Sequence, residues 1–207
     1  MIRALDIRTA ALTAGALGVG ALLLGAGGLL LGGCGGNEVA VTVDLLSFIP
    51  AASRSDDYLI MPGVFTPPVA LEPQLVTLGE SLAERVDMER VAVNFVVDFV
   101  GEAASGTGSA EVALYLAAPD STSLSNAIYQ SPPIYTGRLD VAAGTRRVLT
   151  GALEATAENG LLPMFQGGDF VLGITISFDA SAATAPLSGQ WTIQQIDALI
   201  LGRTDPL

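Results

Sequence analysis

The chain has 207 residues, of which half are apolar and only 14% are charged, with 24 glycines and 11 prolines. This composition excludes wholesale disorder and fits one ordinary domain. Nine arginines against 21 acidic residues give a net charge of −12, and there is neither lysine nor histidine. Imidazole metal sites and histidine-base catalysis are therefore excluded, and we expect no nucleic-acid partner.

The first residues have the layout of a secretory signal. Arg3 and Arg8 flank Asp6, and then no charged residue occurs until Glu38. Residues 10–31 are almost all Ala, Leu, Gly and Val. A basic start, an apolar run and small residues before a cleavage point are typical of a signal peptide.

The apolar run ends at Leu31-Gly32-Gly33-Cys34, which contains the only cysteine of the chain. This sequence resembles the lipobox of bacterial lipoproteins, with leucine three residues before the cysteine and small residues between them. The resemblance implies a diacylglyceryl group on the thiol of Cys34 and cleavage between Gly33 and Cys34. It also implies that the new amino terminus often receives an acyl chain such as palmitate.

Three other interpretations of this region stay open. The run is close to the roughly 20 residues that span a bilayer, so it could be an uncleaved anchor, although its many glycines disfavour a permanent helix. It could be an ordinary signal that leaves a soluble product. Cys34 could be a buried structural thiol, but only glycines surround it.

We expect a helical signal peptide at residues 1–33, the lipidated cysteine and a short linker at 34–37, and a folded domain at 38–207. Cleavage would leave seven arginines and 20 acidic residues, a net charge of −13. Such a surface does not adhere to anionic lipid, so the acyl chains would hold the protein on the membrane. The predicted location is the bacterial cell envelope, on the outer face of a membrane; Gly35 permits the outer membrane without deciding it.

From residue 38 onward, apolar side chains recur at every second position, as in strands that bury one face. The strongest predicted strands are residues 39–45, 91–100, 112–116, 170–178 and 191–200, and weaker ones are 58–61, 74–78, 134–141 and 146–153. In the last strong strand Trp191 and Ile193 share one phase, whereas Ile196 and the apolar residues after it have slipped by one. A β-bulge around Gln194-Gln195 would restore a common inward face.

Turn chemistry predicts how these strands connect. Residues 101–109, rich in Gly and Ser, are interpreted as a hairpin loop between two strong strands. The proline-rich stretch 50–73 is interpreted as a crossing between sheets. Residues 156–166 predict a short helical turn that packs Leu161, Leu162 and Phe165, and residues 80–89 fit a helical turn or an edge strand equally well.

Many strands with no alternating helices predict an all-β fold, an antiparallel β-sandwich of immunoglobulin-like or jelly-roll topology. The Cys…Trp…Cys pattern of true immunoglobulin domains is absent. About 170 residues bury close to 70% of their unfolded surface, so the domain needs neither a metal nor a disulfide to fold.

Few residues of the sequence are candidates for catalysis. A serine nucleophile could be activated only by a carboxylate, and there is no Gly-x-Ser-x-Gly motif. Carboxylate pairs that could cleave a glycoside are Asp56 with Asp57, Asp98 with Glu102, and Glu154 with Glu158. Twenty acids always supply such pairs, so a solvated acidic surface is the preferred interpretation.

Binding candidates are equally sparse. Calcium could use Asp56-Asp57 or Asp120 with Ser121, which we place in loops, although there is no Asp-x-Asp-x-Asp-Gly motif. Outward tyrosines could form a sugar platform, whereas Trp191 is predicted to be core. Arg146-Arg147 could hold a carboxylate or phosphate, but such pairs more often neutralise neighbouring acids. The candidate platform tyrosines are Tyr115, Tyr129 and Tyr135.

We therefore predict a non-enzymatic, lipid-anchored envelope protein without cofactor, catalytic or metal residues, whose one assigned site is Cys34. Its sandwich would be a structural or protein-interaction module, with the membrane and another envelope protein as partners. The alternative is a carbohydrate- or polymer-binding module that meets a surface polymer, and the third hypothesis is a carboxylate-only hydrolase. An exposed apolar patch would favour the first hypothesis, and a row of exposed tyrosines the second.

Overall fold

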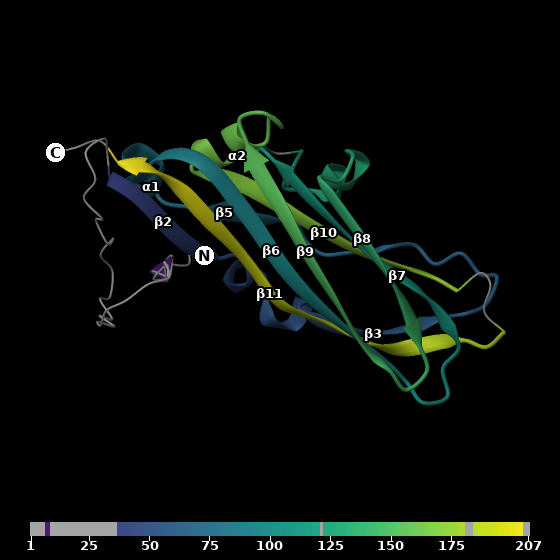
Figure 1. The fold of residues 1–207 in the computed structure, drawn as a ribbon. Coiled ribbons are helices and arrows are strands. Elements are labelled where there is room, and N and C mark those ends of the chain that lie inside the picture. Colours follow the sequence, from purple (N-terminus) through teal and green to yellow (C-terminus); the bar gives the residue numbers. More distant parts are fainter. Residues whose placement is uncertain (1–6, 9–36, 121, 181–183, 205–207) are drawn as a thin grey trace, which may run out of the picture.

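The computed structural model describes residues 7–8, 37–120, 122–180 and 184–204. They form two antiparallel sheets packed face to face, which confirms the predicted all-β sandwich (Figure 1). Sheet A contains β1 (Ile7–Arg8), β2 (Asn37–Asp44), β3 (Ser55–Ile60), β6 (Asp87–Gly101), β9 (Arg146–Thr156) and β11 (Leu187–Thr204). Sheet B contains β4 (Val69–Ala70), β5 (Gln74–Thr77), β7 (Thr107–Ala117), β8 (Tyr135–Ala142) and β10 (Asp169–Asp179).

The pairing of the strands is nested, and this gives the topology. β2 and β3 pair with β11, β4 and β5 with β10, β6 with β9, and β7 with β8. The chain is therefore a long antiparallel hairpin rolled into two sheets, in which β11 also pairs with β6 and β10 with β7. Of the two topologies that the sequence leaves open, this is the jelly roll.

One predicted connection is wrong. Residues 101–109 are not a hairpin loop, because β6 lies in sheet A and β7 in sheet B. The two strands pair with other partners, and the loop between them crosses from one sheet to the other. Gly and Ser residues favour a turn but do not specify which sheet the next strand joins.

Five short helices of the described chain lie in the connections between strands and pack against the sheets. They are η1 (Leu46–Phe48), η2 (Ala51–Ser53), α1 (Glu80–Arg85), η3 (Asn126–Gln130) and α2 (Leu162–Gln166). The ambiguous stretch 80–89 is both structures in turn, since α1 leads directly into β6. The helical turn predicted before β10 is α2, which buries Leu162 and Phe165. No helix in the described ranges is long and apolar enough to cross a bilayer.

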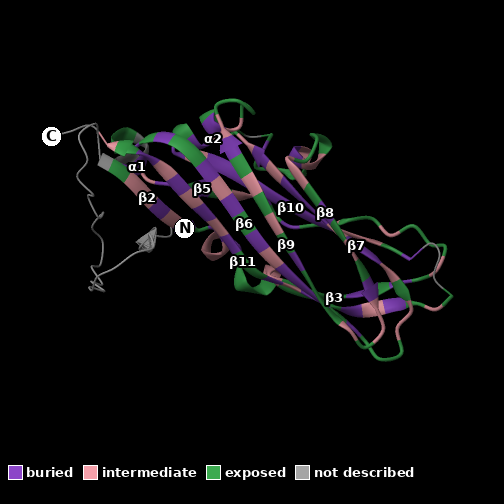
Figure 2. Cartoon of the chain, in the orientation of Figure 1, coloured by how far each residue is buried: buried purple, intermediate pink, exposed green. Residues whose placement is uncertain are grey.

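The core lies between the inward faces of the two sheets (Figure 2). In β11 the predicted bulge is confirmed: Ile193 pairs with Val97 and Gln195 with Val96, so Gln194 is the extra residue. The bulge brings Trp191 and Ile196 onto the same buried face, each 1% exposed. One additional residue thus keeps an 18-residue strand amphipathic along its whole length.

The outward face of β10 departs from the alternating pattern. Val171 and Thr175, expected on a more polar outer face, are 0% and 7% exposed. The helix η3 covers this face, and Gly173 leaves the space that the ring of Tyr129 fills. Period-two alternation predicts which side a residue faces, but a covering segment decides whether that side meets water.

β11 runs the length of the molecule and defines its two ends. Thr204 pairs with Asn37, whereas Leu187 pairs with Ile60. The 18 residues between these points span about 55 Å at about 3.3 Å per residue. We call the end that contains Asn37 the proximal end, since it follows Cys34 most closely in the chain, and the opposite end the distal end (Figure 1).

The described part of the predicted leader is small. Ile7 and Arg8 form β1, which pairs antiparallel with Val43 and Thr42 at the edge of sheet A. The apolar run, the lipobox and Cys34 lie outside the described residues. Strand β2 begins at Asn37, the last residue of the predicted linker.

Candidate functional site: an apolar surface at the distal end

Exposed apolar side chains gather at the end of β3 and in the segment after it, at the distal end. Leu59 is 66% exposed, Met61 49%, Val64 59% and Phe65 86%. These four residues, which we call the distal apolar surface, are half of the large apolar side chains that the described structure exposes. They belong to an uncharged stretch, residues 58–71. Scattered exposed apolar residues are ordinary, but four within seven residues form a concentrated patch.

Local chemistry explains why this segment leaves the sheet. Alternation along β3 turns Tyr58 and Ile60 into the core and leaves Leu59 outside. A turn follows, in which the amide of Val64 donates to the carbonyl of Met61 at 3.2 Å. Gly63 lies at φ +69°, a conformation that glycine adopts without strain.

A slot separates this segment from the end of β10. Residues 63–66 with Pro68 form one wall and residues 177–180 the other, and the slot, which is open to solvent, has a volume of about 530 Å³. The lining is mostly apolar, with contributions from Val64 and Phe65. The two walls come from parts of the chain about 110 residues apart, so only the folded structure creates the slot.

Aromatic packing holds the β10 wall in place. The ring of Phe178 stacks on that of Tyr58 with centroids 4.3 Å apart, and meets Phe99 edge-on at 6.1 Å. Burial, helped by the nearby charge of Glu102, raises the pKa of Tyr58 to about 12. Within the described structure, the hydroxyl of Tyr58 and the indole N–H of Trp191 are buried without a hydrogen-bond partner.

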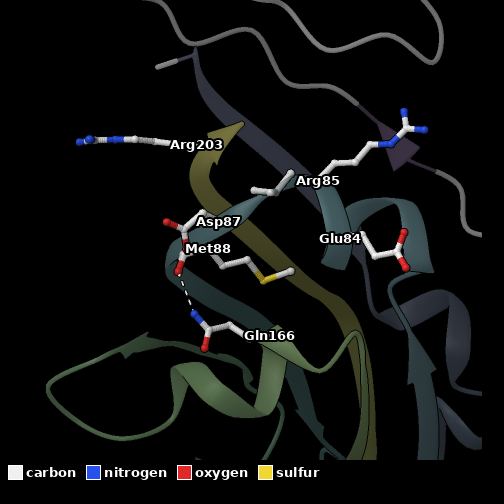
Figure 3. A pocket seen from close by; sticks show the side chains of 7 residues that line it. Glu84, Arg85, Asp87, Met88, Gln166 and Arg203 are labelled. Atoms are coloured by element: carbon white, nitrogen blue, oxygen red, sulfur yellow. Dashed lines mark hydrogen bonds between the residues drawn. The ribbon is translucent and has the colours of Figure 1, made fainter. Parts of the chain in front are cut away.

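A second, more polar pocket lies at the proximal end (Figure 3). Its volume is about 250 Å³, and Gln166 bridges it by donating to the carbonyl of Met88 at 3.3 Å. Arg203 forms an ion pair with Glu89 at 2.9 Å. Figure 3 shows Arg85 and Arg203 pointing away from each other. Because these charges do not converge, the pocket provides no focused binding site.

In the structure, members of each candidate carboxylate pair are engaged elsewhere or face different sides. Asp56 and Asp57 lie on β3 rather than in a loop, and successive strand residues face opposite sides. Asp98 is 5% exposed and forms an ion pair with Arg146. The hydroxyl of Ser188 donates to the other member of that pair, Glu102, and Arg90 lies 3.7 Å from Glu154. Asp98, Glu102 and Glu154 therefore each have a partner of their own.

The candidate calcium ligand Asp120 is also engaged within the protein. Asp120 caps its own turn: one of its carboxylate oxygens accepts hydrogen bonds from the amides of Ser123 and Thr122. These bonds, the Ser123 amide foremost, lower the pKa of Asp120. Its proposed companion Ser121 lies outside the described residues. Among the residues that the structure describes, no three acidic or cysteine side chains are grouped to hold a metal.

The three candidate tyrosines do not form an outward platform, which was the less favoured interpretation of them. Tyr115 and Tyr129 pack edge-on with centroids 5.1 Å apart, and Tyr135 packs edge-on against Phe95 at 4.9 Å. All three tyrosines are only partly exposed because they pack against protein rather than face solvent. The prediction that Trp191 is core is confirmed.

The sequence favoured charge neutralisation over ligand binding for the arginine pair, and the structure shows this for Arg146. Arg146 and Arg147 are consecutive on β9 and so face opposite sides, and Arg146 neutralises Asp98. Sequence reasoning missed the distal apolar surface. The only signal in the sequence was the uncharged stretch 58–71, which also fits a buried crossing between sheets.

Comparisons with known proteins identify no family. No family model matches the chain, and no curated protein matches it. Among solved structures, a chain described as "Structure of infectious bursal disease virus Gt strain" is similar over 80% of this chain, with 10% sequence identity and a TM-score of 0.41. This chain spans about a third, 32%, of that one.

Proposed function

We propose that the protein is a lipid-anchored component of the bacterial envelope, whose non-catalytic jelly roll binds another envelope protein through the distal apolar surface. The observation that carries this proposal is the position of Leu59, Met61, Val64 and Phe65, at the end of the sandwich opposite Asn37. Cys34 supplies the anchor through its resemblance to a lipobox cysteine.

The geometry supports an outward-facing contact. Asn37 follows Cys34 by three residues and already belongs to β2. An acylated Cys34 therefore keeps the proximal end next to the bilayer and allows the distal end to lie up to about 55 Å away. Apolar side chains at that distance cannot insert into the anchoring membrane, so they are free to contact another macromolecule.

Charge favours a different protein over a second copy of this chain. The processed protein would carry a net charge of −13, and copies with so high a like charge repel each other. A sugar-binding role has less support, because Tyr115, Tyr129 and Tyr135 pack against protein. The exposed aromatic ring of the distal apolar surface is Phe65 alone.

The anchor is tested by mass spectrometry of membrane-extracted protein. We expect an N-terminal peptide that begins at a lipid-modified Cys34. A Cys34→Ser variant should carry no lipid and should keep the mass of the uncleaved precursor. Gly35→Ser, next to the modified residue, is the matched control and stays membrane-bound. A peptide that begins at unmodified Gly35, or one that retains Leu31, contradicts lipidation.

The partner surface is tested by photocrosslinking in intact cells. A photoreactive residue at Phe65 is expected to join the full-length protein to one other envelope protein. The same residue at Leu124, which is 46% exposed on the connection after β7, is the control and should give no such product. Equal crosslinking at both positions, or none at Phe65, contradicts a partner at the distal end.

A further inference from the structure

The edge of β10 that faces the slot is only partly paired. Val69 pairs with Ile176, and the amide of Leu71 donates to the carbonyl of Ile174 at 3.0 Å. In an antiparallel strand the backbone groups of alternate residues point to the same side. Those of Phe178 therefore point to the same edge as those of Ile174 and Ile176.

Prolines end the pairing at this point. Continuing the register of β4 by two residues would place Pro67 opposite Phe178. Pro67 has no amide hydrogen to donate, and neither has Pro68 beside it. No strand in the described ranges continues this edge of β10 beyond Ile176, so the backbone N–H and C=O of Phe178 face the slot.

We propose that the partner protein contributes an extended segment that pairs with β10 at Phe178 and places alternate apolar side chains in the slot, against Val64 and Phe65. This inference rests on the proposed function and specifies how the partner binds. Unpaired edge backbone is a template for an added strand: main-chain hydrogen bonds give affinity, and pockets for alternate side chains give specificity.

The chemistry of the slot selects this occupant. A lipid tail would fill the apolar lining but would leave the backbone groups of Phe178 buried without a hydrogen-bond partner, which is unfavourable. A sugar would hydrogen-bond to them but would leave Val64 and Phe65 exposed to its polar surface. An extended apolar peptide satisfies both, and the acidic charge of this chain disfavours a second copy of itself.

The first measurement needs no partner. In the full mature protein, held in detergent, amide hydrogen exchange should be fast at Phe178 and slow at Ile176, whose amide is paired with β4. Phe178 protected to the same degree as Ile176 would overturn the proposal, because no free edge would then exist.

The second measurement uses displayed random peptides as the probe. We expect the mature protein to enrich peptides with apolar residues at every second position. Binding of such a peptide should slow exchange at Phe178. Methylating single peptide amides should weaken binding about tenfold at alternate positions and little at the positions between, because one hydrogen bond is lost at a time.

Variants separate the slot from other surfaces. Val64→Asp with Phe65→Ser should abolish peptide binding, whereas Leu124→Ser should leave it unchanged. Strand addition is overturned if methylation weakens peptide binding equally at every position, or if bound peptides protect amides other than that of Phe178. It is also overturned if no such peptide is enriched. The crosslink from Phe65 tests the proposed function separately, since a partner that docks without adding a strand would still give that product.

Discussion

The hydroxyl of Tyr129 accepts a hydrogen bond from the amide of Ile174 at 3.3 Å and donates one to the carbonyl of Leu71. Leu71 lies between β4 and β5, at the point where the ladder on this edge of β10 is interrupted. One side chain from η3 thus satisfies backbone groups of two segments that are distant in sequence. Burial raises the pKa of Tyr129 to about 12, even though the Ile174 amide acts in the opposite direction.

Tyr129 and Tyr58 should respond differently to loss of the hydroxyl. Tyr129→Phe leaves the backbone groups of Ile174 and Leu71 without their partner and should lower the free energy of unfolding by about 1–3 kcal/mol. Tyr58→Phe removes a hydroxyl with no described partner, so it should be neutral or stabilising by about 1 kcal/mol. Urea denaturation measures both; equal losses would contradict the assigned hydrogen bonds.

Alkaline pH should destabilise the protein through the same two residues. Both tyrosines have a folded-state pKa of about 12 against an ordinary value of 10.0, so the unfolded chain releases these protons first. The stabilising contribution is complete below pH 10 and is lost as the pH rises toward 12. The double variant Tyr58→Phe, Tyr129→Phe should lose less stability over this interval than the parent, as followed by circular dichroism.

Acid should destabilise the protein through protonation of Asp120. Hydrogen bonds from Ser123 and Thr122 hold its pKa below 3.8, so its stabilising contribution is present above pH 3.8 and is lost as the pH falls through the lower, folded-state value. Asp120→Asn keeps the oxygen acceptor but removes the charge. The parent should be more stable than this variant at neutral pH and equal to it in strong acid; a difference independent of pH would show that charge is irrelevant.

Glycine at position 189 should be required by close packing. A Cβ there would overlap the carbonyl oxygen of Val100 and the hydroxyl of Tyr58, so Gly189→Ala should destabilise by about 1–3 kcal/mol. Gly167→Ala is the control, since an added methyl group there would meet nothing within 4 Å and its φ of −68° suits any residue. Thermal unfolding of the two variants gives the comparison.

Deleting the bulge residue should be better tolerated than deleting its neighbour. Without Gln194, β11 alternates regularly and keeps both Ile193 and Ile196 facing inward, at a cost of about 1 kcal/mol from lost twist. Without Thr192, Ile193 turns to solvent and Gln194 enters the core, which should cost about 3 kcal/mol or more. Denaturation midpoints rank the two deletions, and the reverse order would contradict the observed register.

Much of the fold was predictable because strand periodicity is a local property. Every strand that the sequence predicts from residue 38 onward is present, and so are the bulge and the turn that became α2. Pairing was not predictable, as residues 101–109 illustrate: an alternating strand shows an apolar face but does not encode which strand lies beside it.

The candidate site was harder to predict than the fold. The side chains of Val64 and Phe65 are exposed because Pro67 and Pro68 prevent residues 63–68 from joining sheet B. In sequence, the same apolar residues resemble a buried crossing. For Cys34 the situation is reversed. A short local motif is enough to predict its lipidation, but the residue itself lies outside the described residues.

The amino-acid sequence alone determined the charge, the missing histidine and lysine chemistry, the lipobox resemblance at Cys34 and the alternation of each strand. These properties depend on residue identity and near neighbours. The tertiary structure decided the jelly-roll order, the ends at which Asn37 and Phe65 lie, and the unpaired edge at Phe178. Those features arise only when segments far apart in the chain compete for the same hydrogen bonds and the same apolar surface.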